Sequence, residues 1–202
     1  MFFWAGLLGW TLLRPFFVAM GADCAHFFSL RRIVMTKSTR YLTQAAIIAA
    51  LYAVLTHLQN LLLPGSATWA IQMRLSEALC VLALFTPAAV PGLTLGCLIF
   101  NITYAAALPL DFVLGSAATL LAAEGMWLTR KVTVHGYPLP AMLMPAIANA
   151  ILVGWELTVY IGGGFGLNAL YVALGEVAVL LVPGTILYYA LKKRGLENTL
   201  FA

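Results

Sequence analysis

YLTQAAIIAALYAVLTHLQNLLL, which occupies residues 41–63, contains no Asp, Glu, Lys or Arg. A helix that crosses about 30 Å of hydrocarbon needs about 20 mostly apolar residues. This stretch is long enough and apolar enough to do so. It therefore predicts a transmembrane helix, and it is the clearest one in the chain.

The composition of the whole chain agrees with a membrane protein. The chain has 202 residues, of which 63% are hydrophobic and only 9% are charged. An average soluble domain is roughly 45–50% apolar and about 25% charged. The composition excludes a soluble enzyme, a nucleic-acid-binding module and a disordered chain. We therefore expect an integral, multi-pass protein of the cell membrane.

Proline and glycine divide the remaining apolar sequence into helices. The segment Leu75–Leu108 is too long for one crossing, and Pro87 and Pro91 divide it. The glycines of residues 162–166 divide the last apolar segment in the same way. The second helix spans the membrane only if it begins near Trp69 or if the loop before it enters the protein. We predict an all-α membrane protein with six transmembrane helices at residues 41–63, 69–86, 90–108, 111–129, 138–161 and 167–191.

The basic residues support a count of six. With six crossings, the basic residues beside the first, fourth and last helices all lie on one side of the membrane, and Arg74 alone lies on the other. Because Lys and Arg gather on the cytoplasmic side, both termini are predicted to be cytoplasmic, including a tail at residues 196–202. The predicted cytoplasmic residues are Lys37, Arg40, Arg130, Lys131, Lys192, Lys193 and Arg194.

Residues 1–34 precede the predicted membrane domain of residues 35–195. Their apolar part, Phe2–Leu13, is too short to span a membrane and lacks the basic n-region of a signal peptide. Met35 is followed by a short polar and basic stretch typical of the start of a bacterial membrane protein. We expect the natural protein to begin at Met35, and the alternative is that residues 1–34 form an interfacial anchor.

Motifs of ATP binding and of common enzymes do not occur in the sequence. It contains no Gly-x-x-x-x-Gly-Lys-Ser/Thr loop, no His-Glu-x-x-His and no Gly-x-Ser-x-Gly. The three cysteines have no metal-ligand spacing. We therefore expect a protein that is not an enzyme, that holds no metal or cofactor, and that obtains energy for any transport from elsewhere.

Carboxylates inside the apolar segments are the strongest functional signal. An ionisable group at membrane depth costs at least about 2.5 kcal/mol, so each one marks a candidate functional site. Glu156 and Glu176 are the main candidates because neither has a basic residue nearby in the sequence. The other carboxylates in or beside a predicted span are Glu77, Asp111 and Glu124.

These other three carboxylates have structural alternatives. Glu77 has the i,i+3 spacing for an ion pair with Arg74 near a helix start. Asp111 stands where an N-terminal cap is expected. Glu124 is close enough in sequence to reach Arg130.

Polar and aromatic residues near Glu156 and Glu176 complete a predicted pocket open to the outside. Asn149 is seven residues before Glu156 and shares its helix face, and Asn168 lies on the face of Glu176. Asn149 has the alternative role of bridging two helices, and tryptophans also gather at membrane interfaces. The residues predicted to lie nearby in the outer half are Trp69, Asn101, Trp155 and Tyr171.

A stripe of small residues follows the first predicted helix. Ala45, Ala49 and Ala53 recur every four residues, with Ala46 and Ala50 beside them. Such a stripe lets another helix approach closely in lipid. It is either a docking surface for a partner protein or a packing surface within the same bundle.

Five segments carry a resemblance to a known family: RLSEAL (74–79), LFTPAAVPG (84–92), DFVLGSAAT (111–119), NAILVGWE (149–156) and NALYVALGE (168–176). They resemble the QueT family, and the resemblance extends across about residues 36–195. Members of this family are substrate-binding S components of energy-coupling factor transporters, associated with uptake of queuosine precursors. The resemblance implies a six-helix bundle that captures a solute from outside. It also implies docking, through the alanine stripe, on a transmembrane coupling subunit served by two cytoplasmic ATP-binding subunits.

The implied substrate is a deazaguanine base, and it gives the carboxylates a chemical task. One carboxylate accepts the two adjacent N–H donors of the base, and a second holds an aminomethyl ammonium. We expect Glu156 and Glu176 to perform these tasks in an order that the sequence leaves open. Another vitamin-like solute, or a membrane enzyme or sensor, is the alternative. The other residues of the predicted site are Asn149, Asn168, Glu77, Arg74, Tyr171 and Trp155.

Overall fold

The computed structural model describes residues 37–64, 66, 73–104 and 109–193. Within these ranges the chain is helical, without a strand, and a single bridge pairs Val134 with Tyr137. The predicted N-terminal extension, the predicted tail and Trp69 lie outside the described residues. The all-α fold class is confirmed.

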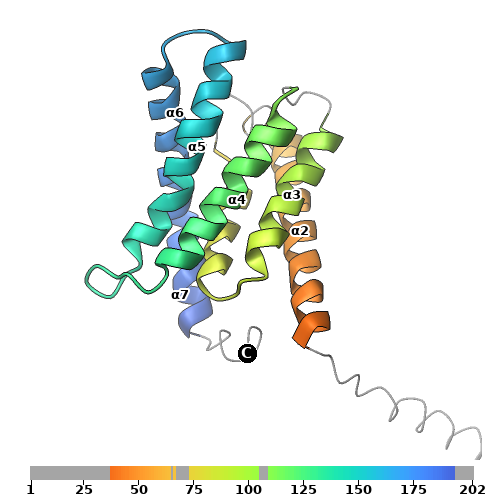
Figure 1. Cartoon of the computed structure of the whole chain (residues 1–202), viewed down its shortest axis with the longest axis vertical. Helices are drawn as coiled ribbons and strands as arrows, with labels where there is room; N and C mark the ends of the chain where they lie inside the picture. Colours follow the sequence, from red (N-terminus) through yellow and green to blue (C-terminus); the bar gives the residue numbers. More distant parts are fainter. Residues whose placement is uncertain (1–36, 65, 67–72, 105–108, 194–202) are drawn as a thin grey trace, which may run out of the picture. The chain divides into compact units, whose positions relative to one another are not determined.

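The helices agree closely with the apolar segments of the sequence. The fourth helix begins at Asp111 and ends at Thr129, as the sequence predicts, and the first begins four residues early at Lys37. In chain order the elements are α2 (Lys37–Leu62), the 3-10 helix η1 (Leu75–Leu84), α3 (Ala89–Thr103), α4 (Asp111–Thr129), α5 (Leu139–Tyr160), α6 (Phe165–Val179), the π-helical turn η2 (Leu180–Gly184) and α7 (Thr185–Lys193) (Figure 1).

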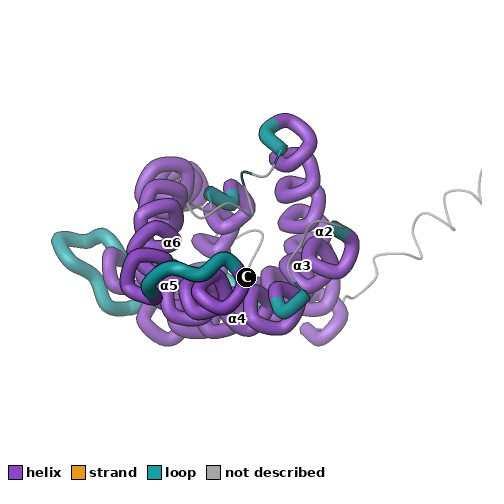
Figure 2. Tube along the Cα trace, turned by 90° about the horizontal axis from the view of Figure 1, so that it is seen from above, coloured by secondary structure: helices purple, strands orange, loops and turns teal. Residues whose placement is uncertain are grey.

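The short helix η1 lies at the centre of the bundle. Seen from above, α2, α3, α4, α5 and α6 follow one another in sequence order around the interior (Figure 2). The η1 helix packs against α3, α4, α5, α6, η2 and α7. Most of its residues are buried, including Ser76, Glu77 and Cys80. It therefore carries polar side chains into the interior of the protein.

Four helices among the described residues are long and apolar enough to cross a membrane, against six predicted spans. The second and third predicted helices are represented by η1 and α3, which are shorter apolar helices. Of the second predicted helix, residues 69–86, the structure describes residues 73–86, and Leu75–Leu84 form η1. Pro87 follows this helix, and the chain turns there into α3. The four long helices are Lys37–Leu62, Asp111–Thr129, Leu139–Tyr160 and Phe165–Lys193.

The last of these helices is continuous through a proline. Pro183 lies inside the π-helical turn η2, which joins α6 to α7. A proline in a regular α-helix removes a backbone hydrogen bond and collides with the preceding turn. A π turn is one of the few arrangements that takes up such a defect without ending the helix.

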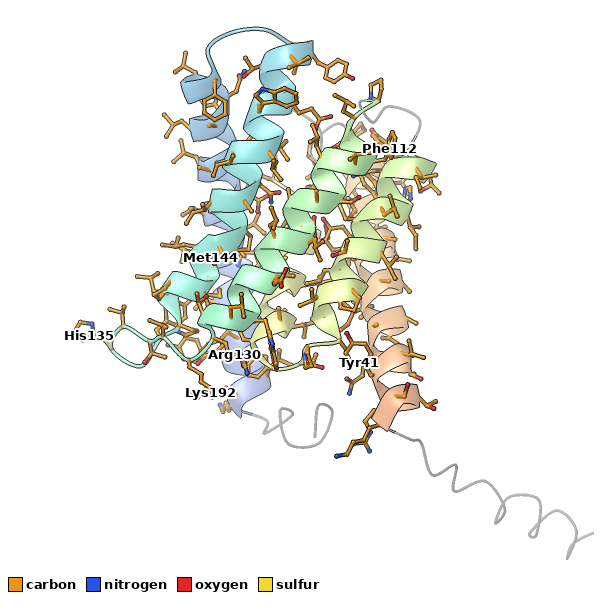
Figure 3. All side chains as sticks on the ribbon, in the orientation of Figure 1. Tyr41, Phe112, Arg130, His135, Met144 and Lys192 are labelled. Atoms are coloured by element: carbon orange, nitrogen blue, oxygen red, sulfur yellow. The ribbon has the colours of Figure 1, made fainter. Side chains whose placement is uncertain are left out.

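Two basic residues, Arg130 and Lys192, lie at the end of the bundle opposite the start of α4. Tyr41, Arg130 and Lys192 lie at one end, and Phe112 lies at the other (Figure 3). Arg130 and Lys192 thus share an end, as the positive-inside rule requires of cytoplasmic residues. The orientation of this end in a membrane stays a prediction.

Glycines bring α3 into backbone contact with α2. A Cβ atom added at Gly92 would lie 2.8 Å from the carbonyl oxygen of Ala45, and one at Gly96 would lie 2.7 Å from Tyr52 Cβ. Ala45, Ala49 and Ala53 are buried. Helix α3 therefore packs against the alanine stripe of α2 at Gly92 and Gly96. This arrangement corresponds to the second of the two alternatives, packing within the same bundle.

We expect Gly96→Ala to lower the free energy of unfolding by about 1–3 kcal/mol, because the added methyl group overfills the contact between α2 and α3. Gly166→Ala is the control, since a Cβ at Gly166 would meet no atom within 4 Å. The control is expected to be neutral or stabilising because Ala favours helix. Thermal unfolding of the purified protein in detergent measures both, and equal effects would contradict the close packing.

Candidate functional site

Polar side chains from six elements gather in the apolar interior, and we call this group the interior cluster. All of its members are buried. They come from α2, η1 and the residue before it, α3, α4, α5 and α6. The interior cluster consists of Tyr52, Arg74, Glu77, Cys80, Cys97, Asn101, Asp111, Asn149, Glu156 and Glu176.

An ion pair joins the start of η1 to the start of α4. The Nη2 atom of Arg74 donates to both carboxylate oxygens of Asp111, at 3.4 and 3.3 Å. Asn101 Nδ2 donates to the backbone oxygen of Asp111 at 2.7 Å, which adds α3 to the contact. A Cβ at Gly115 would lie only 2.8 Å from Asp111 Oδ1, so glycine leaves room for this arrangement.

Both carboxylate oxygens of Glu77 have protein donors. The hydroxyl of Tyr52 donates to Oε1, and Cys80 Sγ donates to Oε2 at 3.1 Å. Glu77 thus holds α2 against η1. Its negative charge stays in the interior, but its hydrogen-bonding capacity is largely taken.

Glu176 has one partner and one open oxygen. Asn149 Nδ2 of α5 donates to Glu176 Oε1 of α6 at 2.9 Å. Glu176 Oε2 is buried and makes no hydrogen bond. Asn149 therefore bridges two helices, as its structural alternative proposes, and it also fixes the carboxylate of Glu176.

Glu156 is the least satisfied residue of the interior cluster. Its side chain belongs to a residue that is only 1% exposed, and neither of its carboxylate oxygens makes a hydrogen bond. It interacts electrostatically with Asp111 and Arg74. A buried carboxylate without a donor is costly, and native proteins rarely keep one without a functional reason. The two oxygens are free to accept donors from a ligand.

The interior cluster has an excess of negative charge. It contains four carboxylates, from Glu77, Asp111, Glu156 and Glu176, against the guanidinium of Arg74, which is paired with Asp111. Three carboxylates are left without a cation among the described members of the cluster. A ligand that brings N–H donors or positive charge would compensate them.

Three residues of the predicted site lie away from the interior cluster. Asn168 Nδ2 donates to Thr158 Oγ1 and to the backbone oxygen of Gly162, both at 3.0 Å, and so closes the turn between α5 and α6. Trp155 is 50% exposed and Tyr171 is 39% exposed. These two aromatic rings lie on the outer surface, where the interface-belt alternative places them.

The structure also decides the alternatives for the weaker carboxylates. Glu77 does not pair with Arg74 as its i,i+3 spacing suggests, because Arg74 pairs with Asp111. Asp111 makes no capping hydrogen bond, since Leu110 is the N-cap of α4 and has none. Glu124 is exposed, and Arg130 lies over the ring of Trp127, 3.4 Å from its centroid.

Tyr52 and Cys97 are members of the interior cluster that the sequence did not single out. Arg74 Nη1 donates to Cys97 Sγ at 3.8 Å, and Tyr52 donates to Glu77. Tyr52 is three residues after Ala49, so it extends the buried face of the alanine stripe. The signal that could have identified Tyr52 is its hydroxyl group, which lies on a helix face that packs against another helix.

The comparison with known families matches this chain over most of its length. The family model of the QueT transporter matches residues 42–193. The chain belongs to the QueT transporter family. It is therefore a membrane transport protein, and the match includes the whole interior cluster. Neither the curated proteins nor the solved structures yielded a match to this chain.

The described residues of this QueT transporter give no metal site. They contain no group of three or more His, Cys, Asp or Glu residues that is suited to a metal ion. The interior cluster consists of hydrogen-bond donors, hydrogen-bond acceptors and charged groups. Asn101 Oδ1, Glu156 and Glu176 Oε2 are its unpaired acceptors among the described residues.

We expect Arg74→Met to destabilise the protein by about 3–5 kcal/mol, because it leaves Asp111 buried without a counter-ion. The double variant Arg74→Met/Asp111→Leu should recover most of that loss, since both charges are then removed. Unfolding in detergent measures the two variants side by side. A double variant as unstable as the single one would contradict the role given to the ion pair.

Proposed function

We propose that this chain is the substrate-binding S component of an energy-coupling factor transporter, and that it captures a queuosine precursor, a deazaguanine base, from outside the cell membrane. The observation that carries the proposal is the buried, unpaired carboxylate of Glu156 in a protein of the QueT transporter family. A guanine-like edge presents adjacent N–H donors, which a free carboxylate accepts in pairs.

The interior cluster supports capture of one small polar solute. Glu156 and Glu176 offer the open oxygens, and Asn149 holds Glu176 in place. Arg74 and Glu77 shape the site from η1, through Asp111 and Tyr52. The sequence also predicts that Asn168, Trp155 and Tyr171 contact the solute, and these roles stay predictions. Tyr52 and Phe100 are buried aromatic residues that interact with Arg74.

The partner proteins in this proposal are a transmembrane coupling subunit and two ATP-binding subunits in the cytoplasm. The inner face of the alanine stripe is occupied by α3, so docking requires another face of α2. Ala46, Ala50 and Val54 are exposed and also recur every four residues. We place the docking surface on these three residues, because the small side chains of Ala46 and Ala50 permit close approach of a partner helix.

We expect Glu156→Gln to weaken binding of a deazaguanine base by more than tenfold, since it replaces a charged acceptor by an amide that carries two donors. Glu124→Gln is the matched control, because Glu124 is an exposed carboxylate outside the interior cluster. Calorimetry on the purified proteins measures both affinities. Unchanged affinity in Glu156→Gln would remove Glu156 from the site.

We expect the chain to co-purify with a coupling subunit and ATP-binding subunits, and Ala50→Trp to reduce their recovery at least tenfold by preventing close approach. Leu170→Trp is the control, because Leu170 is also an exposed position but lies on α6. Pull-down from detergent extracts of the native host measures both. Recovery of the chain alone, without any ATP-binding subunit, would contradict the S-component function.

A further inference from the structure

A small cavity with basic lining residues lies at one end of the bundle and shares no residue with the interior cluster. Its volume is about 180 Å³, and its polar lining residues are Arg130, Thr133 and Lys192. Arg130 ends α4 and Lys192 belongs to α7, and both lie at the same end of the protein (Figure 3). Pockets for drug-sized ligands measure roughly 300–1,000 Å³. This cavity therefore suits a smaller group, such as a phosphate.

The two cations that line this cavity have no carboxylate partner among the described residues. Of the five carboxylates in the described ranges, four belong to the interior cluster, and the fifth, Glu124, does not line the cavity. No described carboxylate forms a salt bridge with Arg130 or Lys192. Two positive charges beside one small cavity attract an anion.

Aromatic rings already hold both cations in position. The guanidinium of Arg130 lies over the ring of Trp127, 3.4 Å from its centroid, and donates to the backbone oxygen of Trp127. Lys192 Nζ donates to the hydroxyl of Tyr188 at 3.4 Å. Each cation carries more N–H donors than these contacts use. Because their positions are already restricted, less entropy is lost when they bind an anion.

The other lining residues are apolar and belong to the level of the lipid headgroups. They are Leu84, Phe85, Pro138 and Tyr188. The ring of Tyr188 stacks on Phe85 at 5.9 Å between centroids and meets Tyr137 edge-on at 5.7 Å. Tyrosines gather where a membrane meets water. The cavity thus lies where the phosphates of phospholipids are found.

Exposed apolar side chains on the same two helices favour a lipid over a free anion. Leu128 is 70% exposed two residues before Arg130, and Ile186 is 67% exposed on the helix of Lys192. Such surfaces suit the acyl chains that a lipid carries and inorganic phosphate lacks. Basic pockets between helices on the cytoplasmic side are a known type of site for anionic headgroups.

We propose that this cavity binds the phosphate of an anionic phospholipid, with Arg130 and Lys192 as its cationic partners and Thr133 as a hydroxyl donor. A headgroup without positive charge, such as that of phosphatidylglycerol, fits the site. The ammonium of phosphatidylcholine would add a third cation where no lining residue is a carboxylate. The site is independent of solute capture in the interior cluster.

The test uses three probes and two matched double variants of the full chain. The probes are dioctanoyl phosphatidylglycerol, dioctanoyl phosphatidylcholine and inorganic phosphate. Arg130→Gln/Lys192→Gln removes the two cations of the cavity. Lys131→Gln/Lys193→Gln is the control, because it removes two cations that are adjacent in sequence but do not line the cavity. Affinities are obtained from the rise in unfolding temperature with probe concentration in a non-ionic detergent.

The unaltered chain should bind phosphatidylglycerol at least tenfold more tightly than phosphatidylcholine or inorganic phosphate. Arg130→Gln/Lys192→Gln should weaken binding of phosphatidylglycerol at least tenfold, as expected for the loss of hydrogen bonds from charged groups. The control double variant should weaken it less than threefold, although its net charge changes by the same amount.

Other results overturn the proposal in distinguishable ways. Equal weakening in the two double variants would indicate attraction by the basic surface as a whole, without a site. Equally tight binding of inorganic phosphate would indicate a free anion in place of a lipid, and equally tight binding of phosphatidylcholine would contradict the preference for an anionic headgroup. If no lipid binds and the cavity variant alone reduces recovery of the ATP-binding subunits, the cavity is a protein contact and the proposal is wrong.

A folding control keeps the test decisive, because Arg130 packs on Trp127. Thermal unfolding without probe shows whether each variant folds. If the cavity variant does not fold, Lys192→Gln replaces it, since Lys192 is exposed, and Lys193→Gln is then the control. Lys192→Gln should weaken binding of phosphatidylglycerol at least threefold and Lys193→Gln should leave it unchanged, whereas equal effects would overturn the proposal.

Discussion

The ion pair between Arg74 and Asp111 holds the short helix η1 inside a bundle of longer helices. It joins the residue before η1 to the first residue of α4, and Asn101 adds α3 to the same point. An unpaired charge here would be strongly destabilising in an apolar interior. The pair therefore fixes the position of η1, and η1 in turn brings Glu77 and Cys80 to the centre of the bundle.

The helices that could be predicted from the sequence are those whose apolar residues alone decide the structure. The fourth helix was predicted to the residue because Asp111 and Arg130 limit its apolar segment. The described part of the second predicted helix contains the 3-10 helix η1, which hydropathy does not distinguish from a membrane span. The sequence also did not decide which helix packs on the alanine stripe of α2. The glycines that contact it, at positions 92 and 96, are far along the chain.

The carboxylates of the candidate site could be predicted from the sequence, but their hydrogen-bond partners could not. Glu156 and Glu176 stand out in a chain with few charges, and both are buried with open oxygens. The sequence did not indicate that Asn149 binds Glu176 or that Tyr52 binds Glu77, because these contacts join separate helices. The position of Trp155 beside Glu156 in the sequence likewise does not indicate that half of its surface is exposed.

The π turn η2 has a consequence for the geometry of the last helix. A regular helix advances about 100° per residue, so Tyr188 would lie roughly 120° around the axis from Glu176. One residue inserted by a π turn removes about 100° of this rotation. Tyr188 consequently returns to the side of Glu176, and it is indeed buried. The π turn at Pro183 thus gives the helix from α6 to α7 a single face directed to the interior. Regular helical spacing would place Glu176 and Tyr188 on two different faces.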